Sequence, residues 1–205
     1  MPKSRNSETW VDNFMMYGVD LRRRWMFAGL STIRENSEGE VGYSLMANFS
    51  TCLHLLEYEA ENPALPITIE LTGYGGDYYH ALGIHNRIKQ TQRNGIRVHV
   101  NAYGPTMSGI PMIGAAADVF QLSSETYLQV HWPSTEIVGR FTRAQLMETV
   151  RHNLDTYDTY VDIFWPRFEK KGGTKRQLIG YIDRGTTFTA QRAVQLGFAD
   201  GIIND

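Results

Sequence analysis

The chain has 205 residues, of which 42% are hydrophobic and 20% charged, and its formal net charge is −2. This length and composition predict one globular α/β domain with a substantial core and exclude a disordered or fibrous chain. The near-neutral charge and scattered basic residues argue against nucleic-acid binding, and no stretch reaches the roughly 20 apolar residues that a membrane span needs.

Residues 1–21 form a polar N-terminal segment, which we separate from a single domain over residues 22–205. The segment has no apolar core of the kind that export signals carry. The basic run Arg22 to Arg24 precedes a short predicted strand at 25–28, and we interpret it as a solvated start of that strand.

Residues 41–61 carry apolar side chains at three- and four-residue spacing, which predicts a helix that Asn62 and Pro63 end. The chain's one cysteine, Cys52, lies in this apolar stretch, so we expect a buried core residue and not a nucleophile. A single cysteine excludes an internal disulfide and suits a reducing compartment, so a cytoplasmic location is expected.

The next part of the chain alternates strands and helices. Strands are predicted at 67–71, 96–100, 119–122 and 126–130, and helices at 77–92 and 109–117. This order is typical of a parallel sheet with crossover helices, in which ligands bind beyond the carboxyl ends of the strands. Three features follow predicted strands: the glycine-containing turns at 72–76 and 103–108, and His131. We therefore expect them to share a site.

The last third of the chain begins with a long helix, predicted over about 142–170. Thr142 and Gln145 fit a capping box at its start, Pro166 is expected to break or kink it, and Gly172 follows its end. A helix this long in a small domain suggests an arm that reaches another subunit. Shorter helices are predicted at 175–182 and 189–196.

Ser108 ends the second turn and begins a helix rich in small residues. A serine at a helix N-terminus lies beside free backbone N–H groups and the positive end of the helix dipole, which suits a nucleophile and its oxyanion. Taken alone, Ser108 fits a simple N-cap better. The paired Gly75 and Gly76 let backbone N–H groups approach a ligand, although a tight turn explains them equally well.

His131 follows a predicted strand, where it can act as base to a serine on a neighbouring turn. The other five histidines fall within predicted helices or a strand and are expected to be packed or at the surface: His54, His80, His85, His99 and His152. His54 and His80 lack the further ligands of a zinc site, so neither a metal nor another cofactor is expected.

Taken together, these motifs resemble the Clp protease (ClpP) family. Residues 71–76 resemble its Ser-Pro-Gly-Gly stretch, residues 104–109 its Gly-x-Ala-Ala-Ser-Met turn, and residues 131–133 its His-Gln-Pro. Residues 56–63 are close to the end of its first helix, and residues 189–200 to its closing Ser-Ala helix. The resemblance covers residues 22–203 in order and implies a ClpP/crotonase-like fold of repeated β-β-α units with a protruding handle helix.

The resemblance implies a serine endopeptidase in which Ser108 is the nucleophile and His131 the base, with the N–H groups of Gly76 and Gly109 as the oxyanion hole. The family's acid corresponds in position to Gly185 here, so Asp183, two residues earlier, is the candidate for the triad. The alternative is that Asp183 simply ends its helix.

The family also implies an assembly. Two heptameric rings of identical subunits would interlock through the handle, with residues 134–140 lining substrate and the N-terminal segment near an axial pore. An AAA+ unfoldase such as ClpX, ClpA or ClpC would supply unfolded protein, and neither nucleic acid nor membrane would be a partner. Alternatives are a catalytically silent ClpR-like subunit, a phage capsid-maturation peptidase and an acyl-CoA hydratase of the related crotonase fold.

Overall fold

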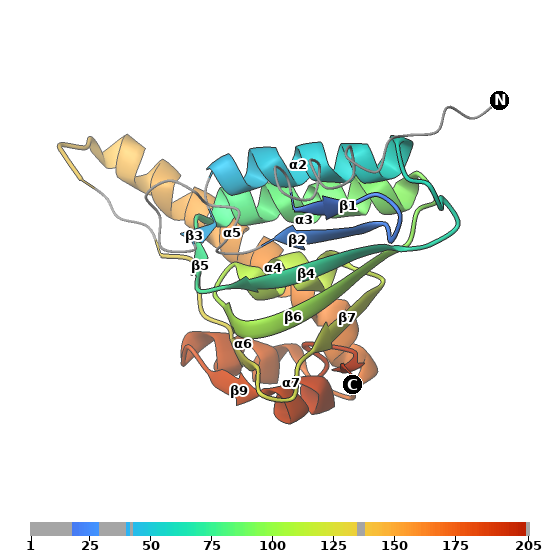
Figure 1. Ribbon diagram of the computed structural model, residues 1–205. Helices are drawn as coiled ribbons and strands as arrows, with labels where there is room; N and C mark the ends of the chain where they lie inside the picture. Colours follow the sequence, from blue (N-terminus) through green and yellow to red (C-terminus); the bar gives the residue numbers. More distant parts are fainter. Residues whose placement is uncertain (1–17, 29–39, 42, 135–137, 204–205) are drawn as a thin grey trace.

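A computed structural model describes residues 18–28, 40–41, 43–134 and 138–203 (Figure 1). Its centre is a sheet whose main path is parallel except at its first strand, which runs antiparallel to its neighbour. The fold is therefore mixed α/β, as predicted. The strands of the main path lie in the order β1 (Val19–Asp20), β2 (Trp25–Ala28), β4 (Ile67–Gly73), β6 (Val98–Met107), β7 (Val119–Leu122) and β10 (Gly201–Ile202).

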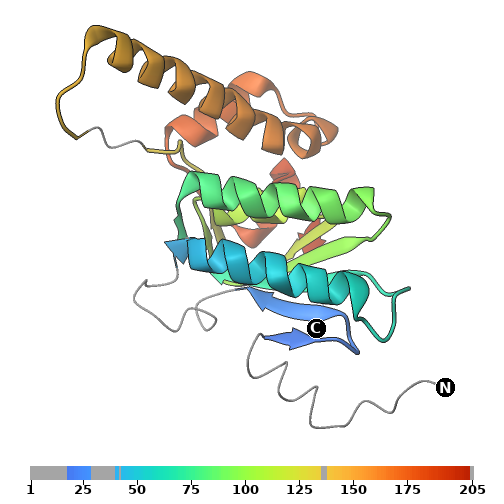
Figure 2. The same ribbon diagram turned by 90° about the horizontal axis from the view of Figure 1, so that it is seen from above.

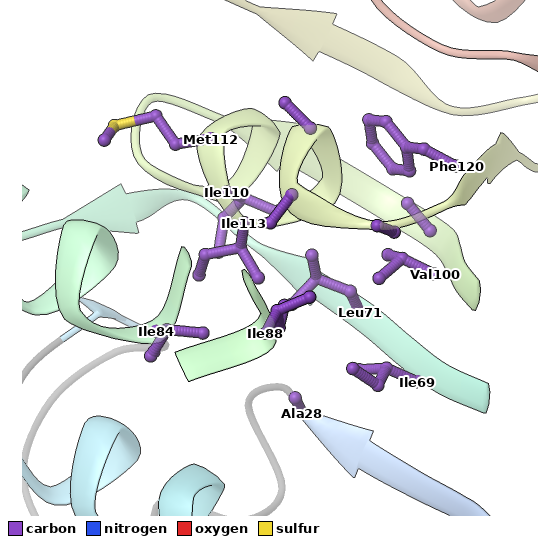
Figure 3. Close-up of a cluster of buried hydrophobic side chains, with 14 of the residues drawn as sticks. Ala28, Ile69, Leu71, Ile84, Ile88, Val100, Ile110, Met112, Ile113 and Phe120 are labelled. Carbon is purple, nitrogen blue, oxygen red and sulfur yellow. The ribbon is translucent and has the colours of Figure 1, made fainter. Parts of the chain in front are cut away.

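Helices α2 (Tyr43–Tyr58), α3 (Tyr78–Arg93) and α4 (Ile110–Ala116) pack together over the sheet. Figures 1 and 2 show α2 and α3 running side by side. Alternate residues of β4 are buried, which matches the two-residue period of a strand with one face on the core. Figure 3 shows buried isoleucines of α3 and α4 meeting aliphatic side chains of β4 and β6, so this helix–sheet interface is the hydrophobic core.

Strand β6 is long enough to pair twice. On one side it pairs with β4. On the other, its first half pairs with β7 and its last two residues, Thr106 and Met107, pair with β8 (Tyr127–Gln129), which in turn pairs antiparallel with β9 (Thr187–Thr189). A separate two-stranded sheet joins β3 (Glu40–Val41) to β5 (Gly75–Gly76). These short pairings gather the end of β6, the glycine turn and the segment after β8 at one edge of the domain.

Helix α5 (Arg143–Lys170) has the bounds that the sequence predicts, and its capping box between Thr142 and Gln145 is formed. The expected break at Pro166 was wrong, because the helix continues through it. Proline removes one backbone hydrogen bond, and buried Phe164 and Phe168 on either side of Pro166 hold the helix in the core. The N-terminal half of α5 projects from the domain in both views (Figures 1 and 2).

The carboxyl-terminal elements pack on the other half of α5. Helix α6 (Lys175–Asp183) contacts α5 directly, and α7 (Ala190–Leu196) contacts β8 and β9. An aromatic cluster links these elements, with ring centroids of Phe168 and Phe198 5.6 Å apart and those of Phe188 and Phe198 5.1 Å apart. Across the described ranges, no helix is long and apolar enough to cross a membrane.

The interpretation of the basic run as solvated holds for Arg22 and Arg23 but is wrong for Arg24. Arg24 is 2% exposed and has a positive φ of 54°. Its guanidinium donates hydrogen bonds to the carbonyls of Leu56, Pro63 and Leu65. Arg24 therefore ties the end of α2 to the start of β2. Of the N-terminal segment predicted over residues 1–21, residues 1–17 lie outside the described part of the chain.

Candidate active site

The structure brings four of the five predicted site residues to one cavity of about 150 Å³. Ser108 and Gly109 reach it from the end of β6, Gly76 from β5 and His131 from the segment after β8. Side chains of α3, α4 and α5 complete its lining, among them Tyr78, Tyr79, Met112, Asn153, Thr156 and Tyr160. Residues 134–140, predicted to line substrate, include 135–137, which lie outside the described residues.

Ser108 occupies a strained turn between β6 and α4. Its φ is 57°, in the left-handed region that costs a non-glycine residue roughly 1–2 kcal/mol, and its N–H donates to the carbonyl of Gln129 at 3.1 Å. The N-cap of α4 is Gly109, without a side-chain capping bond, so the interpretation of Ser108 as an N-cap was wrong. This turn leaves the Ser108 side chain beside the cavity and not against the helix.

The two glycines of β5 are required by contacts on either side. A Cβ on Gly75 would lie 2.3 Å from Cβ and 2.8 Å from Oγ of Ser108, and a Cβ on Gly76 would lie 2.4 Å from the backbone nitrogen of Val41. Both have φ above +100°. The backbone of the Gly-Gly turn therefore packs directly against Ser108 on one side and pairs with β3 on the other.

Gly76 and Gly109, the predicted oxyanion donors, flank Ser108 on the same cavity. A Cβ on Gly109 would lie 3.0 Å from Cβ of Ala81 in α3, so this position is also tightly packed. Both residues have the backbone N–H that an oxyanion hole uses, in a place where a serine adduct would form.

His131 is half-buried, and its Nδ1 lies 2.7 Å from the carbonyl oxygen of Trp132. A carbonyl oxygen only accepts, so this contact assigns the proton to Nδ1 and leaves Nε2 as the acceptor. That is the form in which a histidine can take a proton from serine. Among the described residues no hydrogen bond joins Ser108 to His131, although both side chains line the cavity.

Asp183, the candidate acid of the triad, has no hydrogen bond to His131 in the described part of the chain. It is the last residue of α6, and its Oδ1 accepts the indole N–H of Trp132 at 2.6 Å. Gly185, which corresponds to the family's acid, has a φ of 59°, and a Cβ there would lie 3.7 Å from Cβ of His131. The backbone thus turns toward His131 two residues after the carboxylate, at a residue without a side chain.

Residues 38–205 match the family described as Clp protease. The chain belongs to the Clp protease family. The match covers every element from β3 onward and all five predicted site residues, and it supports a ClpP-like peptidase. A comparison with curated proteins finds no match.

Two features of this Clp protease site were not predicted from its sequence. Trp132 entered only as part of a motif, and its hydrogen bond to Asp183 could not be predicted from local spacing because the two residues are 51 positions apart. The second is a contact between Tyr79 of α3 and His152 of α5, whose side chains are hydrogen-bonded and whose rings stack at 5.8 Å. This pair connects α5 to the rim of the cavity.

Cys52 is not among the residues that line this cavity. Burial raises the pKa of the Cys52 thiol to about 11, so it is a protonated core residue, as its apolar surroundings suggested. Within the part of the chain that the structure describes, no three His, Cys, Asp or Glu side chains gather as metal ligands.

Proposed function

We propose that this chain is a serine endopeptidase subunit in which Ser108 is the nucleophile and His131 the general base. The observation that carries the proposal is the strained Ser108 turn. The backbone of Gly75 lies against Ser108, and the same cavity holds an acceptor nitrogen of His131. Such backbone strain concentrates at functional sites, since it costs stability wherever it occurs.

The proposed reaction follows from these groups. Oγ of Ser108 bonds to the carbonyl carbon of the scissile peptide while Nε2 of His131 takes the hydroxyl proton. The N–H groups of Gly76 and Gly109 donate to the resulting oxyanion. The carbon–nitrogen bond then breaks, and the leaving amine takes the proton from His131. Water repeats the sequence on the acyl-enzyme and regenerates Ser108. Substrate binding must bring Ser108 and His131 within hydrogen-bond distance.

The surface of α5 supports an oligomer. Its projecting half and the residues before it expose a row of apolar side chains: Phe141, Leu146, Met147, Val150 and Leu154, each between 41% and 61% exposed. Contiguous apolar surface of this kind marks an interaction site in a soluble chain. We infer that α5 joins copies of this chain into the interlocked heptameric rings of the family, which degrade unfolded protein supplied by an AAA+ unfoldase.

A catalytically silent subunit of a mixed ring is the second candidate. Two observations favour it: Gly185 stands where the family has its acid, and the described residues show no Ser108–His131 hydrogen bond. This candidate predicts a ring that assembles normally but hydrolyses no peptide.

Labelling with a fluorophosphonate, located by mass spectrometry on the assembled protein, tests the first candidate. We expect an adduct on Ser108, and we expect Ser108→Ala to lose both the adduct and peptide hydrolysis. Ser124→Ala, in an exposed loop away from the cavity, is the matched control and should keep both. Intact rings that show neither labelling nor hydrolysis would establish the silent subunit instead.

A further inference from the structure

Trp132 connects His131 to Asp183 through two hydrogen bonds made by one residue. Its carbonyl oxygen lies 2.7 Å from Nδ1 of His131, and its indole nitrogen donates to Oδ1 of Asp183 at 2.6 Å. No carboxylate of the described residues contacts His131 directly. The carbonyl of Trp132 therefore occupies the role that an acid has in a serine–histidine–aspartate triad.

The position of that carbonyl depends on the Trp132 ring. The ring packs against two residues of α5, with centroid distances of 4.7 Å to Tyr157 and 6.1 Å to Tyr160. Pro133 follows, which restricts the backbone of Trp132 to extended conformations. The indole–carboxylate bond and the ring contacts hold Trp132 in place, and because Pro133 restricts the backbone of Trp132, the direction of its carbonyl follows from that placement.

The loop after α6 is hydrogen-bonded to the strand that leads into His131. The N–H of Val130 donates to the carbonyl of Thr186 at 3.1 Å, and the side chain of Gln129 donates to the carbonyl of Gly185 at 3.4 Å. Both bonds join the strand that leads into His131 to the residues that directly follow Asp183. The two ends of the Trp132 connection are therefore fixed to each other.

We propose that Asp183 is a positioning residue that acts on His131 through Trp132, a role that rests on the proposed serine peptidase function. The imidazole must carry its proton on Nδ1 to accept one from Ser108 at Nε2, and the imidazolium formed needs an acceptor at Nδ1. The Trp132 carbonyl supplies this acceptor, and Asp183 keeps it aimed. Loss of either bond allows the Nε2–H tautomer, which cannot accept the serine proton.

Three variants separate this role from a direct triad. Trp132→Phe removes the indole donor and Asp183→Leu removes the acceptor, and each should lower kcat by roughly 10- to 100-fold with KM within about twofold. Asp183→Asn keeps an oxygen acceptor and should lose no more than a few-fold. The Trp132→Phe/Asp183→Leu double variant should be no slower than Trp132→Phe alone, because both changes break one connection.

Two kinetic outcomes would overturn the proposal. Equal losses in Asp183→Asn and Asp183→Leu would mean that the carboxylate charge acts on His131 directly. Additive losses in the double variant would mean that Trp132 and Asp183 act separately. Arg184→Ala is the control. Arg184 is the exposed neighbour of Asp183, its guanidinium lies over the ring of Tyr181, and its replacement should leave kcat unchanged.

A readout without turnover keeps this proposal distinct from the proposed function. In the Ser108→Ala background, ¹⁵N NMR of labelled histidine, assigned with His131→Gln, should show the Nδ1–H form. Asp183→Leu should convert it to a mixture, and Asp183→Asn should restore the single form. An unchanged tautomer in Asp183→Leu refutes the positioning role. A Ser108→Ala variant that still hydrolyses peptide refutes the serine peptidase instead.

Discussion

Replacing Gly75 by alanine tests whether the backbone of the glycine turn sets the position of Ser108. The added methyl group would lie 2.3 Å from Cβ of Ser108, whereas ordinary contact begins at 3.4 Å, so the two must separate by about 1 Å. Gly95→Ala is the matched control. Gly95 also has a positive φ, of 82°, but a Cβ there meets nothing within 4 Å.

The two substitutions share the cost of a left-handed alanine, about 1–2 kcal/mol. Gly75→Ala adds overpacking against Ser108, which costs a further ~1–3 kcal/mol. In a chain of this size each kcal/mol lowers Tm by about 2–4 °C, so Gly75→Ala should melt roughly 2–12 °C below Gly95→Ala. A displacement of 1 Å at a reacting atom can reduce the rate by about 100-fold.

Thermal unfolding of both variants measures the stability difference, and the rate of fluorophosphonate labelling measures the position of Ser108 without a peptide substrate. We expect slow labelling in Gly75→Ala and the unsubstituted rate in Gly95→Ala. If Gly75→Ala labels at the unsubstituted rate, the close approach of Gly75 does not set the Ser108 geometry. Equal melting temperatures would remove the steric argument as well.

Three further predictions follow from single contacts. Gly185→Asp places a carboxylate beside His131 at a φ that aspartate tolerates, and it should raise kcat above that of Gly185→Ala in a peptide hydrolysis assay. Arg24→Ala removes the hydrogen-bond donor of three carbonyls and should lower the free energy of unfolding, measured in urea, by roughly 3 kcal/mol or more. Replacing the exposed Arg23 by alanine should change it little. Because burial raises the pKa of Cys52 to about 11, native protein should resist thiol reagents at pH 8, and the stability this thiol contributes should be intact below pH 9 and fall as pH rises toward 11.

Elements with strong local signals could be predicted from the sequence. Helix α5 begins where its capping box indicates and ends before Gly172, and β4 follows its apolar pattern into a glycine turn. Strand β6 was predicted to end at residue 100, but it continues to Met107 through most of the predicted turn at 103–108. Because the strands are parallel, both turns lie at one edge of the sheet, so the sequence was enough to predict that Ser108, His131 and the glycines lie together.

The features that could not be predicted depend on contacts between distant residues. Arg24 was predicted to be a solvated charge, but it is buried and donates to one carbonyl near the end of α2 and to two in the loop before β4. Proline is unfavourable inside a helix, but the sequence could not show that buried aromatic side chains on either side would let α5 continue through Pro166. The family resemblance made Asp183 the candidate acid, yet its hydrogen-bond partner is the indole of Trp132, and this contact depends on how α6 packs beside the segment after β8.

The geometry bears unequally on the active and silent candidates. The backbone strain at Ser108 costs stability whatever its role, and a silent subunit gains nothing in return for that cost. The missing acid at Gly185 argues the other way, but the tautomer that a serine base requires is already set by the Trp132 carbonyl. A neutral acceptor stabilises an imidazolium less than a carboxylate does, so this arrangement favours a slower enzyme over an inactive one.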